Sequence, residues 1–460
     1  MSATLVESSR DGVAGLPPGP KGRPVVGCLF ELRRDLLGFM TRAAREYGDV
    51  VFFKFIHIPV CLLSHPDDIE AVLVKNASRF VKSRDYRALA GVVGEGLVTS
   101  EGDQWRRQRK LVQPAFYRDH ILGYAKVMTA CAGRAIDAWR DGEALDVHQE
   151  MMRLTLQVAA RCLFGTDVSA RADEVGTALQ VVMEHFADYA RLAMVMPKRF
   201  RIPRWSKMGR AVRRLDAIVY GIIRERRRQK DSADSRDLLN LLLLARDETG
   251  GQMDDRELRD EVMTLLLAGH ETTALALSWT WYLLSQHPEA EEKLAAELRQ
   301  VLAGRAPSPD DLPTLPYTDA VLKESMRLYP PAWGIGRETL DGFDAGGYHL
   351  PAGTNVFISP WVTHRDPRLF PDPDRFDPER WQTNPMRPGK LPRFAYFPFG
   401  GGPRVCVGAG FAQMEAALLL AAIAQRFRLT LVPGHPIQLL PSVTLRPKRG
   451  IRMVVHQRSS

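Results

Sequence analysis

A single cysteine, Cys406, lies in a glycine-rich run that spans residues 399–408 and reads Phe-Gly-Gly-Gly-Pro-Arg-Val-Cys-Val-Gly. Glycine permits backbone conformations and close approaches that other residues cannot make, so such a loop can lie against a flat cofactor. A predicted helix starts just after Cys406, and the free N–H groups at its start would stabilise a thiolate. A thiolate on haem iron favours cleavage of the O–O bond. The pattern therefore predicts a thiolate ligand, and the structural alternative is a small buried cysteine in a turn.

A second polar group interrupts a long apolar helix that the sequence predicts from Asp254 to just before Pro288. Residues 268–273 of this helix read Ala-Gly-His-Glu-Thr-Thr. Buried Glu and Thr side chains are costly unless something uses them, and a glycine inside a helix costs about 1 kcal/mol. Glu271 and Thr272 therefore indicate a widened groove with a polar patch. In the structural alternative, Thr272 bonds the carbonyl four residues back and Glu271 forms a salt bridge.

Two further helix faces carry side chains that pair with carboxylates. Glu324 and Arg327 are three residues apart, so they share a helix face and can pair with each other. Trp105 and Arg109 are four residues apart, and arginine binds carboxylates through two parallel hydrogen bonds. The alternative for Trp105 and Arg109 is a cation–π pair on the surface.

The cysteine run matches the haem-binding signature F-x-x-G-x-R-x-C-x-G at every fixed position: Phe399, Gly402, Arg404, Cys406 and Gly408. The chain thereby resembles the cytochrome P-450 superfamily, and the resemblance covers nearly its whole length. It implies a mainly α fold with a small β portion. In that fold, haem b lies between the long central helix and the helix that follows the cysteine loop.

The resemblance also implies roles for the other residues. Thr272 would hydrogen-bond the oxygen ligand and Glu271 would help to relay protons. Residues that hold the haem would be Trp105, Arg109, Arg337, Phe399, Arg404 and Gly408. A structural network would comprise Glu324, Arg327 and Arg380, the last within Pro378-Glu379-Arg380-Trp381, where Trp381 replaces the usual Phe. His270 is interpreted as a packing or hydrogen-bonding residue, because one thiolate already serves the iron.

The sequence predicts the elements that must position these residues. Asp254 and Glu257 form a capping-box pattern at the start of the central helix, and Pro288 suits the first turn of the next helix. Two strands are predicted, over Val50 to Phe55 and Val60 to Leu63. Further helices are predicted over Asp319 to Tyr329 and over Ala409 to Phe427. The region from Asp341 to Pro360 is predicted to hold glycine-rich turns and short β runs. We expect a single domain over residues 1–460, with residues 1–15 as a flexible tail.

Composition narrows the class of protein. The chain has 460 residues, 45% of them apolar, and a net charge of +9. Thirteen basic residues and two acidic ones fall between Pro197 and Lys230, which favours a solvated helix face, with contact to a membrane surface or an acidic partner as the alternative. The stretch lacks a nucleic-acid-binding signature, so no such partner is expected. Five scattered cysteines and the lack of a signal peptide or membrane span predict a cytoplasmic protein, and a monomer is expected.

The resemblance implies a monooxygenase that uses O2 and two electrons from outside the chain. A separate ferredoxin or flavodoxin with its reductase would supply the electrons, so NAD(P)H would act only indirectly. Arg106, Arg107 and Lys110 suggest a basic patch for an acidic electron donor. The alternatives are a peroxygenase or an isomerase on the same haem fold, or a haem-based sensor or carrier without catalysis.

The substrate is expected to be lipophilic, such as a fatty acid, a terpenoid or a steroid, because small-molecule pockets are mostly apolar. By resemblance, the pocket would be lined from residues 86–98, 177–204, 332–335 and 442–444, and from the central helix. The named lining residues are Ala268, Leu265, Leu267, Trp333, Ile335 and Val443. Ala-Gly-His-Glu-Thr-Thr also occurs near the fatty-acid-hydroxylating branch, and Arg199, Arg201 and Arg204 could attract a carboxylate.

Overall fold

The computed structural model describes residues 15–165, 174–183, 185–186, 189, 203, 206–228, 237–382 and 391–458. The chain forms two compact units, each described in turn. The first unit comprises Met1–Ser83, Gly334–Pro371 and Pro392–Arg404, and the second comprises Arg84–Trp333, Asp372–Leu391 and Val405–Ser460. The boundary between the units falls inside the cysteine run, at the peptide bond between Arg404 and Val405.

The first unit is built on a five-stranded mixed sheet in the order β1-β2-β8-β5-β3. Its strands are β1 (Val50–Phe55), β2 (Ile58–Leu63), β8 (Asn355–Ile358), β5 (Ile335–Thr339) and β3 (Phe80–Lys82). Only the β2–β8 pair is parallel, with Val60 opposite Asn355. The strands are rich in β-branched and aromatic residues, which suit a pleated, half-buried surface. Both strands predicted near the N-terminus are confirmed, although β2 begins two residues earlier than expected.

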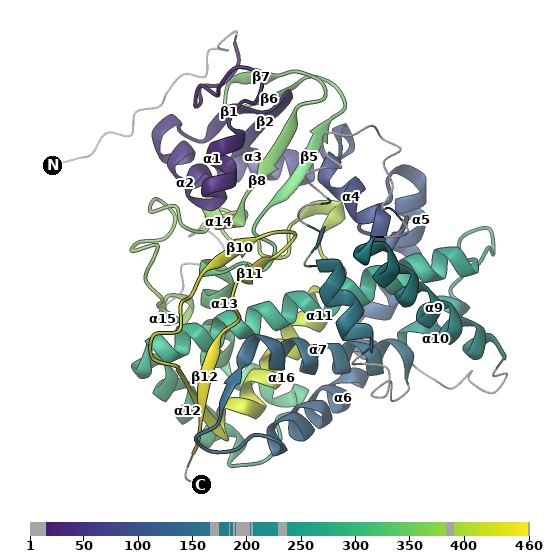
Figure 1. Ribbon diagram of the computed structural model, residues 1–460, viewed down its shortest axis with the longest axis vertical. Coiled ribbons are helices and arrows are strands. Elements are labelled where there is room, and N and C mark those ends of the chain that lie inside the picture. Colours follow the sequence, from purple (N-terminus) through teal and green to yellow (C-terminus); the bar gives the residue numbers. More distant parts are fainter. Residues whose placement is uncertain are drawn as a thin grey trace. The chain divides into compact units, whose positions relative to one another are not determined.

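Short helices and one hairpin complete the first unit (Figure 1). They are α1 (Leu29–Arg34), α2 (Leu36–Tyr47), α3 (Pro66–Glu70), a π-helical turn (Ala71–Lys75), two 3₁₀ turns (Ala77–Arg79 and Gly402–Arg404), α14 (Pro360–Thr363), and the β6–β7 hairpin (Phe343–Ala345 and Tyr348–Leu350). Leu63, Phe80 and Ile335 belong to one buried apolar cluster in this unit. Ile335 therefore comes from a sheet strand whose neighbours fix its position.

The second unit is almost entirely helical. Its helices are α4 (Arg84–Val93), α5 (Gly102–Val112), α6 (Arg118–Asp137), α7 (Val147–Phe164), α9 (Lys207–Arg228), α10 (Leu238–Leu244), α11 (Asp255–Gln286), α12 (Pro288–Leu302), α13 (Pro316–Leu328), α15 (Glu379–Gln382) and α16 (Ala409–Ala424), with 3₁₀ turns at Gln113–Phe116 and Pro309–Thr314. The predicted start of α12 at Pro288 is confirmed, and α13 begins three residues before the predicted position.

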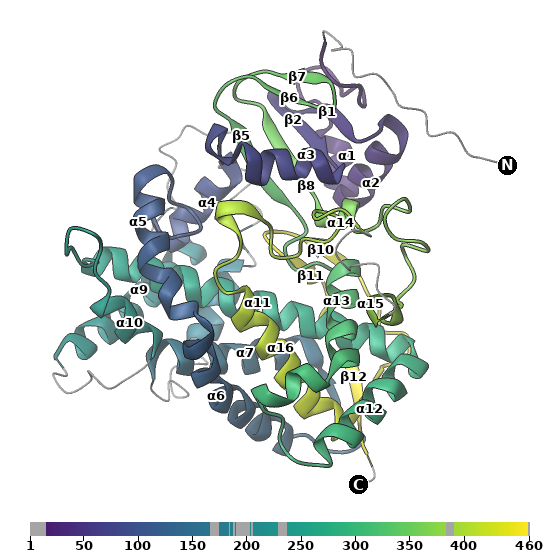
Figure 2. The ribbon, with the colours of Figure 1, turned by 180° about the vertical axis from the view of Figure 1, so that it is seen from behind.

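Helix α11 runs through the middle of the second unit. Its predicted capping box is present: the Glu257 N–H donates to Asp254 Oδ1 at 2.8 Å, and the Asp254 N–H donates to Glu257 Oε2 at 3.0 Å. The helix is 32 residues long, which corresponds to roughly 48 Å. Helices α7 and α16 both pack against it, and α6 lies beside α16 (Figure 2). This contact on several sides explains why α11 is apolar nearly all round.

Two small sheets lie in the second unit. One has the order β4-β12-β9 (Ala144–Asp146, Arg452–Gln457, Phe427–Leu431), and the other is the hairpin of β10 (Leu439–Pro441) and β11 (Leu445–Pro447). The prediction that the last helix reaches Phe427 was wrong. Helix α16 ends at Ala424, and Phe427 pairs with Gln457 as the first residue of β9. The pairing partner comes 30 residues later, so the local apolar pattern could not reveal it.

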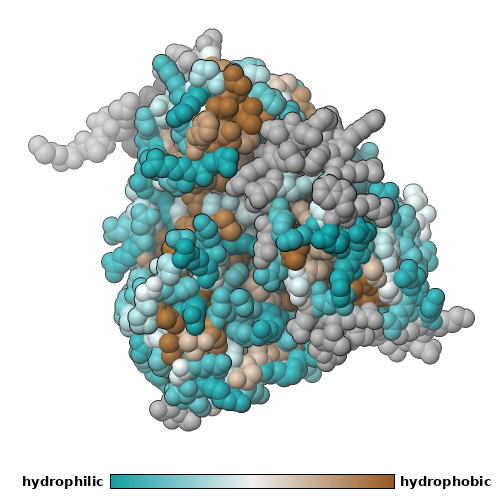
Figure 3. Space-filling model, in the orientation of Figure 1, coloured by the Kyte–Doolittle hydropathy of each residue, from teal (hydrophilic) through white to brown (hydrophobic). Residues whose placement is uncertain are grey.

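Apolar side chains of the second unit gather in its interior. Two buried clusters surround α11, and the face in Figure 3 is largely hydrophilic with scattered apolar patches. Within the described ranges, no helix is both long enough and apolar enough to cross a membrane.

Candidate active site

Cys406 lies in the second unit, two residues before Gly408, the N-cap of α16. Its side chain is accessible to solvent, yet enough protein surrounds the sulfur that burial raises the pKa of the thiol. The Gly408 N–H and the Arg109 guanidinium both lower this pKa, because both favour the thiolate. A cysteine on an exposed loop, with a backbone donor and a cation beside its sulfur, is chemically suited to ligate a metal.

Arg109 is fixed to the cysteine loop by a direct hydrogen bond. Its Nη1 donates to the Val405 carbonyl oxygen at 2.9 Å, and its Nε donates to Gln113 Oε1 at 3.3 Å. Trp105 lies one turn earlier on α5 and packs against the buried cluster beside α11. The structure therefore brings Arg109 and Cys406 together within the second unit.

The first unit carries Arg337, Phe399 and Arg404. Arg404 Nη1 donates to the carbonyl oxygens of Ala77 and Phe80, at 3.3 and 3.1 Å. Arg337 is buried in β5, where its Nη1 donates to the Gly336 carbonyl oxygen at 2.9 Å. These bonds hold two guanidinium groups against the backbone of the first unit.

Gly402 shows why the run needs glycine. It has a φ of +68°, and a Cβ at this position would come within 1.9 Å of the Leu73 carbonyl oxygen. Any other residue would collide with the backbone of the π-helical turn, so the close approach predicted for this loop occurs within the protein itself.

One face of α11 is open along an otherwise buried helix. Between Leu258 and Leu284, the residues that are not buried are Leu265, Ala268, Gly269, Thr272 and Tyr282. Ala268, Gly269 and Thr272 follow Leu265 by three, four and seven residues, so these four share one helix face. A Cβ on Gly269 would meet nothing within 4 Å, so space lies beside the helix there. The stripe contains Leu265 and Ala268, two of the three α11 residues predicted to line the pocket, whereas the third, Leu267, is buried.

The two polar residues of this segment are already partnered. Thr272 Oγ1 donates to the Ala268 carbonyl oxygen at 2.8 Å. Glu271 is buried, accepts a hydrogen bond from Thr444 Oγ1 at 2.7 Å, and forms an ion pair with Arg446. Both contacts are those that the structural alternative predicted, and the role of the two residues in catalysis stays a prediction. No local pattern pairs Thr444 and Arg446 with Glu271, because both lie more than 170 residues from it in the sequence.

His270 packs as predicted. It is buried, and its Nδ1 lies 2.9 Å from the Leu266 carbonyl oxygen. The carbonyl oxygen of His270 accepts a hydrogen bond from Thr155 Oγ1 at 2.8 Å. Burial lowers the pKa of His270, and this favours the neutral imidazole.

Glu324 is fully buried and sits at the centre of a hydrogen-bond network that includes the equally buried Arg327. It accepts hydrogen bonds from Arg327 Nε and Nη2 at 2.8 and 2.9 Å, from the Asp377 N–H at 3.0 Å, and from Arg380 Nε at 3.4 Å. Trp381 Nε1 adds a fifth donor at 2.9 Å. Phenylalanine could not make this bond, so the departure at Trp381 supplies an extra contact that the sequence comparison did not anticipate.

The residues predicted to contact substrate come from both units. Leu265, Ala268, Trp333 and Val443 belong to the second unit and Ile335 to the first. Trp333 Nε1 donates to the Ser442 carbonyl oxygen at 3.0 Å, next to Val443. Much of the predicted lining over 177–204 lies outside the described residues, as do Arg199, Arg201 and Arg204 and both ends of the basic stretch from Pro197 to Lys230.

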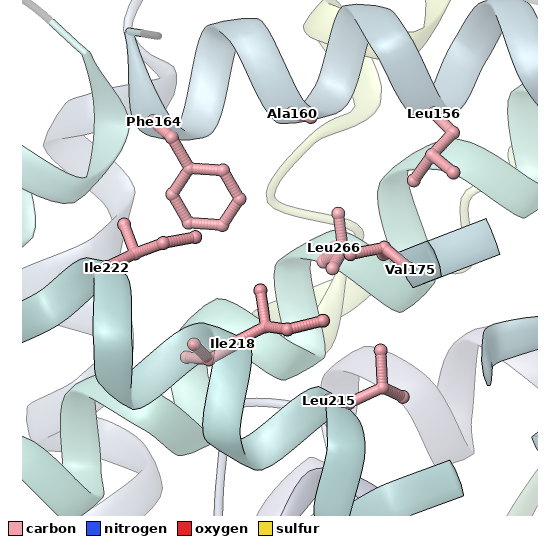
Figure 4. A pocket seen from close by; sticks show the side chains of 9 residues that line it. Leu156, Ala160, Phe164, Val175, Leu215, Ile218, Ile222 and Leu266 are labelled. Carbon is pink, nitrogen blue, oxygen red and sulfur yellow. The ribbon is translucent and has the colours of Figure 1, made fainter. Parts of the chain in front are cut away.

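A small apolar cavity lies between α7, α9 and α11 of the second unit (Figure 4). Side chains from α7, α9 and α11 and from Val175 point into it. Its lining residues are all apolar: Leu156, Ala160, Phe164, Val175, Leu215, Ile218, Val219, Ile222 and Leu266. Leu266 follows Leu265 of the open stripe, so α11 contributes adjacent residues to two different apolar surfaces.

The basic residues suggested as a donor patch are each paired with an acid. Arg106 pairs with Asp103, and Lys110 pairs with Glu248 at 2.6 Å. Arg107 pairs with both Asp247 and Glu257 at 2.7 Å. These contacts offset much of the positive charge that the sequence suggested for the patch.

Comparisons with known proteins agree with this fold and these motifs. Residues 17–453 match the family model described as Cytochrome P450. The chain is 41% identical to cyclooctatin synthase of Streptomyces melanosporofaciens, over 93% of this chain and 92% of the relative. It is 34% identical to pentalenene oxygenase of Streptomyces avermitilis, over 96% and 97%.

A further relative is cyclooctat-9-en-7-ol 5-monooxygenase of Streptomyces melanosporofaciens, 38% identical over 92% of this chain and 91% of the relative. Among solved structures, retinoic acid bound cyanobacterial CYP120A1 matches with a TM-score of 0.86 and 28% identity, over 97% of this chain and 100% of that one. The predicted fold, mainly helical with small sheets, is thereby confirmed. The chain belongs to the cytochrome P450 family and is a monooxygenase that uses haem b and O2.

Proposed function

We propose that Cys406 is the thiolate ligand of the haem iron and that the enzyme hydroxylates a terpenoid. The observation that carries the first part is the solvent-exposed Cys406, where burial of the sulfur raises the pKa of the thiol and the Gly408 N–H and the Arg109 cation partly offset that rise. Bound haem supplies the activation of O2, and a thiolate ligand favours cleavage of the O–O bond.

Four residues hold the haem propionates: Trp105, Arg109, Arg337 and Arg404. Arginine binds carboxylates through charge-assisted hydrogen bonds, and backbone contacts fix the orientation of all three guanidinium groups. Phe399 and Gly408 complete the cysteine loop around the ligand. Glu324, Arg327 and Arg380 support the loop region as a structural network around the buried Glu324.

Thr272 and Glu271 serve the proton transfers. Thr272 lies on the open stripe of α11, so its hydroxyl can hydrogen-bond a group that enters there. Glu271 is the adjacent carboxylate, and a positioned carboxyl group can pass protons in either direction. Ala268, another residue of the open stripe, gives the substrate room beside Thr272.

Three lines of support favour a terpenoid substrate. The names of the relatives concern cyclooctat-9-en-7-ol, cyclooctatin and pentalenene. One solved structure with the same fold is described as bound to retinoic acid. The proposed lining residues Leu265, Ala268, Trp333, Ile335 and Val443 present apolar or aromatic groups, as expected for a lipophilic ligand.

Electrons come from a ferredoxin or flavodoxin with a separate reductase, and NAD(P)H acts only through that reductase. We place the enzyme in the cytoplasm as a monomer. Any contact with a membrane is peripheral, at the membrane surface.

Optical spectroscopy of the purified, haem-loaded protein tests both parts of the proposal. With carbon monoxide, the reduced protein should show the red-shifted Soret band of thiolate ligation, Cys406→Ser should lose it, and Cys28→Ser should keep it. A cyclic diterpene alcohol should shift the ferric spectrum at lower concentration than a fatty acid of similar size. Retention of the band in Cys406→Ser would refute the ligand assignment, and a preference for the fatty acid would refute the substrate class.

A further inference from the structure

Three consecutive charged residues near the start of α11 are buried: Arg259, Asp260 and Glu261. Charged side chains are rarely buried unless they are paired. The partners of these three residues lie on other parts of the second unit, and they show what the start of α11 holds in place.

The Arg259 guanidinium joins three helices. Its Nη2 donates to the Val92 carbonyl oxygen in α4, and its Nε donates to Asp216 Oδ1 in α9, both at 2.8 Å. Its Nη1 donates to Asp260 Oδ1 on α11 itself, also at 2.8 Å. The guanidinium is planar and its donors have fixed directions, so these bonds define where α4 and α9 lie against α11.

Asp260 and Glu261 bind the backbone of residues 94–97, which follow α4 directly and are called segment 94–97 below. The Glu95 N–H donates to Asp260 Oδ2 at 2.8 Å, and the Leu97 N–H donates to Glu261 Oε2 at 3.2 Å. Hydrogen bonds to carboxylates are stronger than those between neutral groups. The segment is therefore attached to α11 by specific bonds as well as by packing.

Two glycines allow segment 94–97 to lie directly on α11. Gly94 has a φ of +74°, and a Cβ there would come within 2.1 Å of Asp260 Oδ1. A Cβ on Gly96 would come within 2.2 Å of Thr264 Oγ1. Larger residues would push the segment away from the helix, so the sequence is built for this close approach.

The end of the segment belongs to the apolar cluster beside the proposed substrate pocket. Leu97 is one of its buried members, and Val98 packs against it. Leu265 and Val443, two of the proposed lining residues, pack against the same cluster. A shift of the segment would therefore reach the side chains proposed to contact substrate.

We propose that Arg259 is a positioning residue for substrate specificity. It fixes segment 94–97 and α9 on α11, and it thereby sets the pocket wall at Leu97 and Val98. The inference rests on the proposed function and on the predicted lining of the pocket by residues 86–98. Arg259 itself contacts no substrate in this proposal, because its donors are used by protein acceptors.

Removal of the guanidinium should loosen segment 94–97, because Asp216 and Asp260 bind the same cation and would repel each other without it. In Arg259→Met, backbone hydrogen exchange of the segment should become faster by about tenfold or more, since a hydrogen bond to a charged group contributes at least that factor to an equilibrium. Mass spectrometry of the haem-loaded protein measures this exchange. Arg259→Met/Asp216→Asn removes one of the two negative charges and should recover part of the protection. Arg259→Lys keeps the charge without the fork of donors and should lie between Arg259→Met and the unaltered protein.

Binding of a cyclic diterpene alcohol gives the second readout. In Arg259→Met, its dissociation rate, followed by stopped-flow measurement of the optical shift, should rise by about tenfold or more. The ratio of its Kd to that of a monoterpene alcohol should move towards one, because a loosened wall distinguishes sizes less well. The rate of product formation in a single turnover at saturating substrate should stay within about twofold, since Arg259 does not touch the reacting atoms.

Arg226→Met is the matched control. Arg226 of α9 is as buried as Arg259, pairs with Asp237, and donates to the Phe164 carbonyl oxygen at 2.5 Å. Its substitution also leaves a buried aspartate without its cation, but these bonds lead to α7 and to the N-cap of α10. Exchange of segment 94–97 and the dissociation rate of the diterpene alcohol should stay within about twofold in this variant.

Three outcomes would overturn the inference: unchanged exchange of segment 94–97 in Arg259→Met, an unchanged dissociation rate and Kd ratio in that variant, or equal changes in Arg226→Met. If Arg259→Met does not fold, Asp216→Asn and Arg259→Lys carry the same two measurements, with smaller changes in the same direction. A missing thiolate spectrum or optical shift in the unaltered protein would instead refute the proposed function, and hydrogen exchange would still test whether Arg259 positions the segment.

Discussion

Two buried glutamates of the second unit, Glu324 on α13 and Glu415 on α16, have the same exposure and opposite surroundings. Both are 0% exposed. Glu324 accepts hydrogen bonds from five donors, two of them on Arg327. Neither carboxyl oxygen of Glu415 has a hydrogen-bond partner among the described residues. Burial alone therefore does not decide whether a carboxyl group is charged; the donors around it do.

The difference appears directly in the protonation of Glu415. Burial raises the pKa of Glu415 to about 8, and the Thr273 hydroxyl only partly opposes this effect. Thr273 lies close to the carboxyl group, but its hydroxyl donates its hydrogen to the Gly269 carbonyl oxygen at 3.3 Å, so Thr273 opposes the effect of burial only weakly. Glu415 is thus protonated at pH 7, whereas the geometry around Glu324 is that of an ion pair.

The largest effect should come from breaking the Glu324 network. Arg327→Ala leaves a buried carboxylate without its cation, so the free energy of unfolding should fall by about 3 to 5 kcal/mol. Urea unfolding followed by far-ultraviolet circular dichroism measures the loss. Glu415→Ala removes no ion pair, and an equal or larger loss in that variant would contradict the comparison.

A smaller, pH-dependent effect should distinguish Glu415. Its pKa is raised from an ordinary value of 4.5 to about 8, so its contribution to stability is fully present below about 4.5 and is lost as pH rises towards 8. Within this window, the loss should be about 1.4 kcal/mol per pH unit at most. Glu415→Gln should therefore gain stability relative to the unaltered protein as pH rises, and urea unfolding at several pH values measures the difference. A constant difference across the window would rule out a protonated Glu415.

A single donor to Glu324 should be worth less than its cation. Trp381→Phe removes the indole N–H and restores the residue that is usual in the family, so the loss should be about 1 to 3 kcal/mol. Trp333→Phe, which removes an indole bond to a backbone carbonyl oxygen, gives the matched control for the same chemical change. A loss in Trp381→Phe smaller than in Trp333→Phe would show that the charged acceptor adds nothing.

The smallest effect is expected at the surface. Arg106 pairs with Asp103 on an exposed face of α5, where solvent screens the interaction. Arg106→Ala should change the free energy of unfolding by less than about 0.5 kcal/mol. The same urea experiment measures it, and a loss above 1 kcal/mol would place this pair with the buried network.

Local features of this chain could be predicted from sequence, and distant pairings could not. Asp254 and Glu257 are three residues apart, so their pattern predicted the start of α11 correctly. The bond from Thr272 to Ala268 is also local, and the sequence had suggested it as an alternative. In contrast, Arg446 reaches Glu271 only because the β10–β11 hairpin is anchored on α11, and no local pattern encodes that anchoring. The roles assigned to the site residues and the single-domain organisation remain predictions.

The close approach of Gly402 to Leu73 has a consequence for how the signature residues tolerate change. Saturation mutagenesis at position 402 should recover glycine alone, because any added carbon meets the Leu73 carbonyl oxygen at 1.9 Å and the φ of +68° disfavours other residues. This intolerance originates within the first unit and would persist in a variant selected only for folding. One glycine of a cofactor-binding signature is thus required for the chain to fold. If only glycine is recovered at this position in a mutagenesis experiment, that result carries no information about cofactor binding.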